Sequence, residues 1–402
     1  MSFSIANTGL SAVTEQLNTI SNNIANSATK GFKSGRTEFG SMYAQSQPLG
    51  VAVTGVSQSI SKEGSINRTD KAMDLAISGG GFFVMKDGSG NTVYTRAGAI
   101  ETDNSGKLVN SMGMKLQGYP ADAMGNLQTG VITDLQVNST GLPAKASTKV
   151  DIIANLQATA SVPTNATFSP TASDSYNTSI TSTIYDSLGR EHTLNQYFIK
   201  QATPVGSWKV EFTIDNATVA GALAHTLQFD VNGVLDNTTA HKTALAGTFT
   251  PAGAATYSLD IDYTGTKQFN GMFATTKNKS DGYTAGTKNG ERIESDGSLY
   301  ATFSNGERML QGKLVLANFA NPNGLATQNG TSWSETGKSG TALLGAPGTG
   351  LLGNVEAGAL ESSNVDLTAE LVGLMTAQRN YQANTKIIST NDSMMNALFQ
   401  VL

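Results

Sequence analysis

The sequence predicts a mixed, mainly β protein in which long N- and C-terminal α-helices enclose two nested β-rich domains. Two observations support this fold class. Apolar residues recur every seven positions at both ends of the chain, as on one face of a helix. Between the ends, apolar and polar residues alternate with a period of two, as in half-buried strands. We expect the two helices to form an inner, coiled-coil-like layer.

The N-terminal helix is predicted from an apolar stripe that begins close to the first residue. Its positions are Phe3, Leu10, Val13, Leu17, Ile20 and Ile24. Gly31 is expected to end the helix, because glycine readily adopts the left-handed conformation found after helix C-termini. Lys30 and Lys33 carry charges that suit the negative end of the helix dipole.

The C-terminal helix is predicted over 367–400 from a longer stripe of the same kind. Its apolar positions are Leu367, Leu371, Leu374, Tyr381, Ile388, Met395 and Phe399. The stripe is mixed, because Gln378, Thr385 and Asp392 occupy companion heptad positions. Ser363 or Asn364 is expected to cap the start of this helix. Such a helix would be roughly 50 Å long at ~1.5 Å per residue.

The interior is predicted to be β-structure from alternation and from turn signals. The alternating apolar sets are Trp208, Val210, Phe212 and Ile214; Leu227, Phe229 and Val231; and Leu259, Ile261 and Tyr263. Asp-Gly or Asn-Gly dipeptides, which favour tight hairpins, begin at positions 87, 232, 281, 296 and 305.

Shifts in composition suggest where the domains begin and end. Three prolines among Ala, Ser and Thr mark residues 143–180 as a boundary or an extended crossover. Lys, Asn and Gly cluster near 278–290, and 337–359 is rich in Gly and Ala. The predicted domains are an N-terminal helix and extended connector at 1–70, a first β domain at 71–147 completed by 284–359, an inserted outer β domain at 148–283, and a C-terminal helix at 360–402.

Composition excludes several classes of function. Charged residues are only 14% of the 402, and the net charge is −5. Nucleic acid and anionic membranes are therefore poor candidate partners. The chain has no cysteine, which excludes disulfides and thiolate chemistry. It shows neither a secretory signal pattern nor ~18 consecutive apolar residues. An extracellular location would thus require export without a cleavable signal peptide.

No catalytic, cofactor-binding or metal-binding site is predicted. The three histidines, His192, His225 and His241, have no ligand partners at short spacing. Asp260 and Asp262 share a strand face and are interpreted as its solvated side. The Gly79-Gly80-Gly81 run lacks the Lys and Ser or Thr of a phosphate loop, so a tight turn before a strand is expected.

Two interpretations of the terminal helices remain open. The helices can pair within one chain, as in small bundles, or they can pack against further copies. A lone pair would leave the flanks of Tyr381, Met395 and Phe399 in water. Six buried heptad residues would contribute about 9–18 kcal/mol as an upper bound. We therefore expect the apolar stripes of both helices to pack between subunits, with polar companions selecting the register.

Several motifs stand out toward both ends of the chain: NNIANSATKGFK at 22–33, LESSNVDL at 360–367, QRNYQAN at 378–384, DLAI at 74–77, GFF at 81–83, YTRAG at 94–98 and LVLANF at 314–319. Together they resemble the motifs of bacterial flagellar rod and hook proteins. The signature positions of this resemblance are Asn22, Asn23, Asn26, Gly31, Phe32, Asn364, Asp366, Gln378, Arg379, Tyr381 and Asn384.

The segment between the two ends is more similar to hook than to distal rod proteins. A distal rod subunit would be shorter, and SYN at 175–177, IYDS at 184–187 and YF at 197–198 resemble the outer domain of hook proteins. The resemblance implies a structural subunit that self-assembles into a flexible tube and transmits motor torque from rod to filament. It implies many copies of the chain as partners, together with rod, hook cap and hook–filament junction proteins. The alternatives are a distal rod or other axial subunit and, in another class, a β-rich secreted binding protein.

Overall fold

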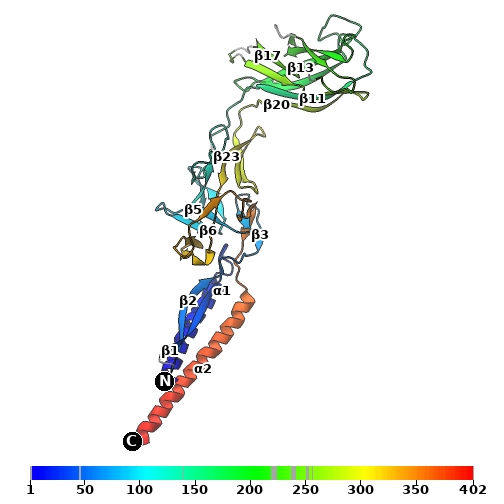
Figure 1. The fold of residues 1–402 in the computed structure, drawn as a ribbon. Coiled ribbons are helices and arrows are strands. Elements are labelled where there is room, and N and C mark those ends of the chain that lie inside the picture. The colour runs from blue at the N-terminus through cyan, green and yellow to red at the C-terminus, as the bar shows by residue number, and fades with distance from the viewer. Residues whose placement is uncertain are drawn as a thin grey trace. The chain divides into compact units, whose positions relative to one another are not determined.

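The computed structural model describes residues 2–44, 47–138, 140–218, 224–236, 241–249, 253–255 and 257–401. It divides into two compact units. Unit 1 comprises Met1–Ser139, Gly290–Thr302 and Arg308–Leu402, and unit 2 comprises Thr140–Asn289 and Phe303–Glu307. The two helices and the strands between them confirm the predicted fold class (Figure 1). Neither helix combines the length and apolarity needed to cross a membrane within the described ranges.

Unit 1 begins and ends with its helices, α1 (Ser2–Ala25) and α2 (Leu367–Val401). Its strands before unit 2 are β1 (Gly35–Ala44), β2 (Gln47–Gln58), β3 (Ile66–Arg68), β4 (Leu75–Ser78), β5 (Phe82–Lys86), β6 (Thr92–Thr95), β7 (Ile100–Thr102), β8 (Leu108–Asn110), β9 (Lys115–Pro120) and β10 (Thr133–Asp134). The later elements are β21 (Lys288–Ile293), β22 (Ser298–Phe303), β23 (Arg308–Leu314), β24 (Leu316–Asn318), the 3₁₀ turn Pro322–Gly324, β25 (Ala326–Gln328), β26 (Ser332–Ser334), β27 (Leu343–Gly345), β28 (Asn354–Ala357) and β29 (Ala359–Glu361).

The largest sheet of unit 1 combines strands from both halves of the chain. Its main path among the described residues runs β21-β22-β23-β9-β5-β6-β26-β25. Phe82, Tyr94, Phe319 and Trp333 pack edge to face within one buried cluster. Two short ladders, β28–β4 and β29–β3, join the segment before α2 to the segment after β2.

Unit 2 is built from two sheets that share one apolar core. Its strands are β11 (Lys149–Gln157), β12 (Thr178–Tyr185), β13 (Glu191–Lys200), β14 (Ser207–Ile214), β15 (Ala217–Thr218), β16 (His225–Gln228), β17 (Lys242–Phe249), β18 (Tyr257–Asp262), β19 (Lys267–Phe269) and β20 (Ala274–Ser280). Within the described residues, one sheet runs β17-β18-β11-β19 with β20 on β11, and the other β12-β13-β14-β15 with β16 on β14. Trp208, Phe198 and Tyr263 are fully buried between them.

Four expectations about local structure were wrong. The 143–180 stretch contains β11, whose Val150, Ile152 and Leu156 are buried; the apolar Ile153 on the other face and the small Ala154 on the buried face obscured the alternation. Val231 is fully exposed because it lies in a turn. The connector in 1–70 contains the β1–β2 hairpin, which covers α1. The Asp281-Gly282 pair forms no hairpin, because the Asp281 carboxylate instead accepts hydrogen bonds from the N–H groups of 148 and 149.

Many of the turns follow a five-residue pattern, Asp or Asn-x-x-Gly-x, and the predicted dipeptides at 87, 232, 296 and 305 all lie within five-residue turns. In the 87–91 turn, the Asp87 carboxylate accepts hydrogen bonds from the N–H groups of Ser89 and Asn91 at 2.9 and 2.8 Å. Gly90, the fourth residue, has a φ of 86°, so it supplies the left-handed residue of a three-residue hairpin loop. The same pattern begins at residues 103, 110, 122, 186 and 230.

The 186–190 turn in unit 2 contains a buried carboxylate. Burial alone would raise the pKa of Asp186, but hydrogen bonds from the Arg190 and Leu188 N–H groups and the Arg190 guanidinium outweigh it and lower the pKa to about 2. The ordinary value is 3.8. Because the folded pKa is depressed, the ionised group stabilises unit 2 above pH 3.8, and this contribution is lost as the pH falls toward 2.

Replacing Asp186 with Asn is expected to destabilise unit 2 at pH 7 and to flatten its loss of stability between pH 4 and pH 2. Hydrogen exchange of β13 peptides during urea unfolding at each pH would measure this. Exposed Asp174 replaced by Asn is the control and should match the parent. A parent and an Asp186→Asn variant with the same acid dependence would contradict the assignment.

Candidate assembly site

The apolar stripe of α1 packs mainly within the chain. Val13 and Ile20 are buried against Ala377 of α2, and Leu17, Ile24 and Leu374 are partly buried in the same cluster. The two helices are antiparallel, since Ile20 lies beside Gly373 and Asn384 lies beside Gly9. The intrachain pairing that the sequence interpretation disfavoured is therefore present for these five predicted interface residues, and the β1–β2 hairpin covers another side of α1.

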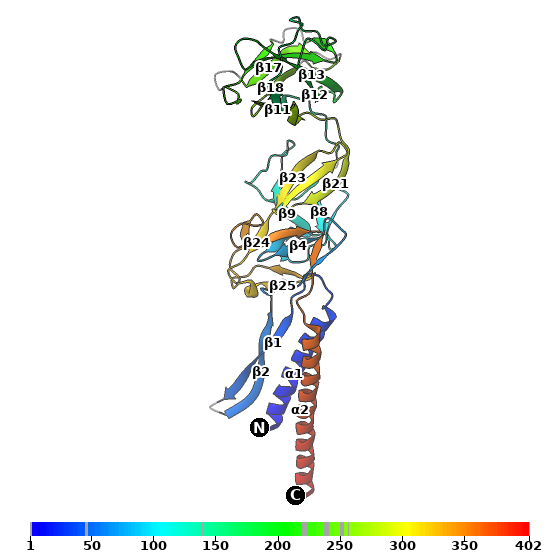
Figure 2. The ribbon, with the colours of Figure 1, turned by 90° about the vertical axis from the view of Figure 1, so that its right-hand side faces the viewer.

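Much of the α2 stripe stays exposed. Leu367, Leu371, Tyr381 and Met395 are exposed, as is Phe3 of α1, whereas Leu10 and Ile388 are half-buried. The side chain of Phe399 lies outside the described part of the structure. Sequence reasoning missed Val372, Met375, Ile387 and Met394, which are also exposed, because they fall off the heptad. The end of α2 extends past the start of α1 (Figure 2). That these exposed apolar residues pack between subunits remains a prediction.

The N- and C-terminal signatures meet after the end of α1 and before the start of α2, at a buried ionic cluster that we call the joint: Lys33, Arg96 and Glu361. The Glu361 carboxylate lies 2.7 Å from Lys33 Nζ and 3.1 Å from an Arg96 guanidinium nitrogen. The three side chains are only 0–4% exposed. Glu361 Oε1 also accepts a hydrogen bond from the Gly64 N–H at 2.9 Å.

Each cation of the joint also donates to main-chain carbonyl groups. Lys33 Nζ donates to the Lys62 carbonyl at 2.7 Å, and Arg96 donates to the Ile77 and Gly79 carbonyls at 3.4 and 2.9 Å. Burial lowers the pKa of Lys33 below its usual value, although the Glu361 carboxylate opposes this. The joint therefore fixes four chain segments in one place: the end of the α1 loop, the β2–β3 connector, the β6–β7 link and the end of β29.

Signature residues around the joint fix the chain through side-chain amides. Asn364 accepts a hydrogen bond from the Ser34 N–H at 2.7 Å and donates to the Ser59 and Lys62 carbonyls. Asn23 bridges the Gly35 backbone and Glu370 of α2, each at 2.8 Å. Asn26 donates to the Asn22 carbonyl at 3.0 Å, and this closes the last turn of α1.

Two predicted helix ends need correction. The helix α1 ends at Ala25, ahead of Gly31. Gly31 has a φ of 71°, and a Cβ there would lie 2.6 Å from the Ala97 nitrogen, so contact with the β domain requires glycine. Asp366 caps α2 by accepting hydrogen bonds from the N–H groups of Thr368 and Ala369 at 3.0 and 3.1 Å. Asn364 is occupied in the joint and cannot serve as the cap.

The remaining signature residues do not gather at the joint. Phe32 is half-buried beside it, and its carbonyl accepts a hydrogen bond from the Asn364 N–H at 3.3 Å. Gln378 and Arg379 are exposed on α2, whereas Asn384 is half-buried against Gly9, where the absent side chain lets the helices approach. Within the described ranges, no three His, Asp or Glu side chains are placed to hold a metal ion.

Lys33, Arg96 and Glu361 were not among the predicted site residues, although each lies within a quoted motif. The available signal was charge. In a chain with 14% charged residues, these three charges fall inside motifs from distant parts of the sequence that carry at most one other charge each. Nothing in the sequence indicated that they meet, because their contacts span from 265 to 328 residues.

Comparison with known families assigns these features to one class of protein. Four family models match in chain order: flagella basal body rod protein at 3–33, flagellar hook protein FlgE/F/G D1 domain at 76–167, flagellar basal body protein FlaE D2 domain at 155–283, and flagellar basal body rod FlgEFG protein C-terminal at 356–401. Such a series defines an axial protein of the bacterial flagellum.

Individual relatives narrow the class. The chain is 41% identical to the flagellar hook protein FlgE of Salmonella typhimurium, with 99% of each chain covered, and 40% identical to that of Escherichia coli K12, with 99% covered. It is 34% identical to the Rhizobium meliloti FlgE, with 97% of this chain and 96% of the relative covered. The chain belongs to the flagellar hook protein FlgE family. The crystal structure of Helicobacter pylori FlgE2 has the same fold, with a TM-score of 0.54 at 16% identity over 74% of this chain and 100% of that one.

Replacing Glu361 with Gln is expected to destabilise unit 1 by about 3–5 kcal/mol, because Lys33 and Arg96 would stay buried without a counter-charge. Urea unfolding read through Trp333 fluorescence in a Trp208→Phe background would measure the loss. Exposed Glu356 replaced by Gln is the matched control, with an expected change within about 0.5 kcal/mol. Equal unfolding midpoints for the two variants would show that the joint contributes no stability.

Proposed function

We propose that this chain is a structural subunit that polymerises into the tubular hook of the bacterial flagellum. The exposed apolar face of α2 is the single observation that supports it best. In one chain α1 covers only one side of α2, and large apolar side chains such as Leu371, Met375 and Met395 are about half exposed or more. Burying each would contribute about 1.5–3 kcal/mol, so side-by-side packing of copies has a large driving force.

The joint suits the mechanical role of such a subunit. A hook acts as a flexible coupling that transmits motor torque from rod to filament. Torque carried by an inner layer of helices must reach the β domain through few chain connections. The Lys33–Glu361–Arg96 cluster provides a short, directional connection whose charges are costly to separate in a buried environment. We infer that it keeps the helices and the β domain moving together under load.

We assign 1–70 and 360–402 to an inner domain, 71–147 with 284–359 to a first β domain, and 148–283 to an outer domain. The match of a D2 family model to 155–283 and the compactness of Thr140–Asn289 support the last assignment. The partners proposed are copies of the chain, rod, hook cap and hook–filament junction proteins. The subunit would be extracellular, exported without a cleavable signal peptide, and would have no enzymatic activity.

Two alternative functions, a distal rod subunit and a β-rich secreted binding protein, fit these observations less well. The alignment with the hook protein of Salmonella typhimurium covers 99% of this chain and 99% of the relative. This full-length match favours a position in the hook over one in the distal rod. A β-rich secreted binding protein is a weaker candidate, because such a protein has no use for an exposed apolar stripe on a terminal helix. The hook subunit therefore accounts for both ends and the middle of the chain.

Replacing Leu371 with Glu is expected to raise the critical concentration for polymerisation roughly 10- to 100-fold, because a buried Leu contributes about 1.5–3 kcal/mol per subunit contact. Sedimentation of polymer from a concentration series would measure this. Val231, which is fully exposed in unit 2, replaced by Glu is the control for an added charge. Unchanged polymerisation of Leu371→Glu would exclude this face from the interface.

Limited proteolysis of dilute monomer is expected to remove the C-terminal end of α2 first, because this end extends beyond α1 and its side chains at 392–397 are exposed. Mass spectrometry of fragments would locate the cuts, and polymer at the same protein mass should resist them. A confirmed monomer whose α2 resists cleavage throughout would show that the helix needs no partner copy.

A further inference from the structure

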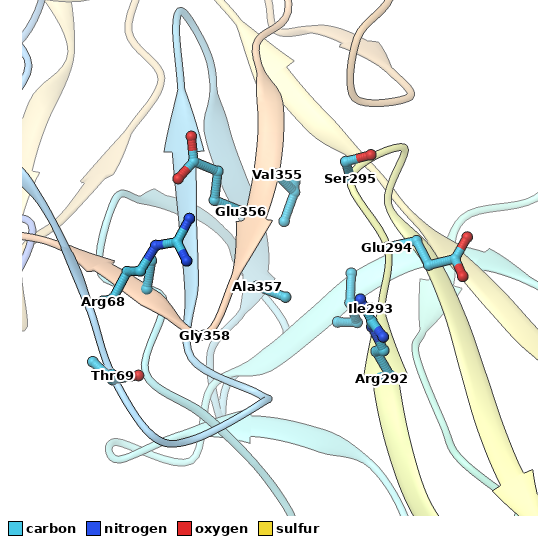
Figure 3. A pocket seen from close by; sticks show the side chains of 11 residues that line it. Arg68, Thr69, Arg292, Ile293, Glu294, Ser295, Val355, Glu356, Ala357 and Gly358 are labelled. Atoms are coloured by element: carbon cyan, nitrogen blue, oxygen red, sulfur yellow. The ribbon is translucent and has the colours of Figure 1, made fainter.

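A slot lies in unit 1 between two strands that end their sheets. The strand β21 is the terminal member of the large sheet, and β28 pairs only with β4 among the described residues. The slot between them has a volume of about 640 Å³, within the range of about 300–1,000 Å³ typical of ligand pockets. Figure 3 shows β28 on one side and the strand carrying Ile293 on the other.

At one end of the slot, β28 is joined to the segment that follows β21. The Val355 N–H donates a hydrogen bond to the Ser295 carbonyl at 3.1 Å. Further along, the strands carry Ile293 and Ala357 on facing sides of the slot (Figure 3). Val355 and Ile293 are buried residues at the edge of the slot, while Ala357 is exposed.

Backbone groups of both strands point into the slot. Bonded and non-bonded pairs alternate in an antiparallel ladder. The Val355 N–H donates to Ser295 and not to β4. Its partner in the ladder, Ile77, likewise directs its carbonyl away from β28, toward the Arg96 guanidinium. Val355 and Ile77 are therefore a non-bonded pair. The N–H and C=O of Ala357 therefore also point away from β4. Glu294 donates to the Ser298 carbonyl across the β21–β22 turn, so the neighbouring Ile293 directs its backbone groups to the opposite edge.

The rim of the slot is charged but balanced. The lining includes two positive side chains, Arg68 and Arg292, and two negative ones, Glu294 and Glu356. Because these charges balance, a neutral polar segment is the best electrostatic match. This chain is unusually rich in such segments, because only 14% of its residues are charged. Residues 158–173, for example, contain no charged side chain.

We propose that the slot receives an extended segment of a second copy of this chain, which pairs through its backbone with β28 and β21 and completes the interrupted sheet. Strand addition to an open edge is a general mode of recognition, in which main-chain hydrogen bonds supply affinity. The inference rests on the proposed function, since only a polymerising subunit presents many copies at short range. It adds a contact in the β domain to the contacts expected between helices.

Hydrogen exchange of Ala357 and Ile293 in monomer and in polymer tests this directly. Pairing predicts slower exchange of both amides in the polymer. Replacing Ala357 with Pro removes the N–H without removing a β28–β4 hydrogen bond, and should raise the critical concentration roughly two- to tenfold. Ala357→Gly, which keeps the N–H, is the control, and circular dichroism would verify that each variant folds.

The outcomes separate the two proposals. Wild-type polymer with unprotected Ala357 and Ile293 amides would overturn the slot inference and leave the hook function standing. An Ile293 amide that stays protected in Ala357→Pro polymer, at an unchanged critical concentration, would also overturn strand pairing at the β28 edge. A wild-type chain that forms no polymer, even from hook seeds, would overturn both.

Discussion

The buried carboxylate of Glu361 is the interaction on which unit 1 depends. It lies between two cations, Lys33 and Arg96, that come from segments far apart in the chain. A buried charge is tolerated only when its partners satisfy it, and a lost partner is far more costly than a lost surface ion pair. The three residues therefore hold their segments in one arrangement. The loop after α1, the connector before β3 and the approach to α2 all take their positions from it.

The glycine and asparagine residues of the terminal signatures follow from this arrangement. Gly31 must approach the Ala97 backbone more closely than any side chain allows. Asn364 and Asn23 hydrogen-bond carbonyl and N–H groups of connectors that form no regular ladder with each other. Their amides satisfy main-chain groups that would otherwise be buried without partners. Asn23, Gly31 and Asn364 thus support the region of the joint, whereas Gln378, Arg379 and Tyr381 are exposed on α2 and Asn384 faces α1.

The two sides of α2 differ in how they are covered. Small residues at Gly9, Gly373 and Ala377 let α1 and α2 pack closely along their shared length. The opposite side of α2 keeps exposed apolar residues over the same length. In the proposed polymer, neighbouring copies would cover this side and would add to the stability of the helix. The proposed strand pairing in the β domain would add a second surface of this kind.

The sequence by itself determined the fold class, the extents of both helices to within a few residues, and most buried faces of unit 2. Heptad spacing and alternation such as Trp208, Val210, Phe212 reflect the periods of a helix and a strand, and these periods can be read from residues close together in the sequence. It did not reveal the β1–β2 hairpin, the capping role of Asp366 or the meeting of Lys33, Arg96 and Glu361. The hairpin and the cap are local features whose turn and cap signals are weak, whereas the three charges meet through contacts between residues 265 to 328 positions apart. Only the tertiary structure brings such residues together, because the free energy of burying a charge depends on the groups around it in space.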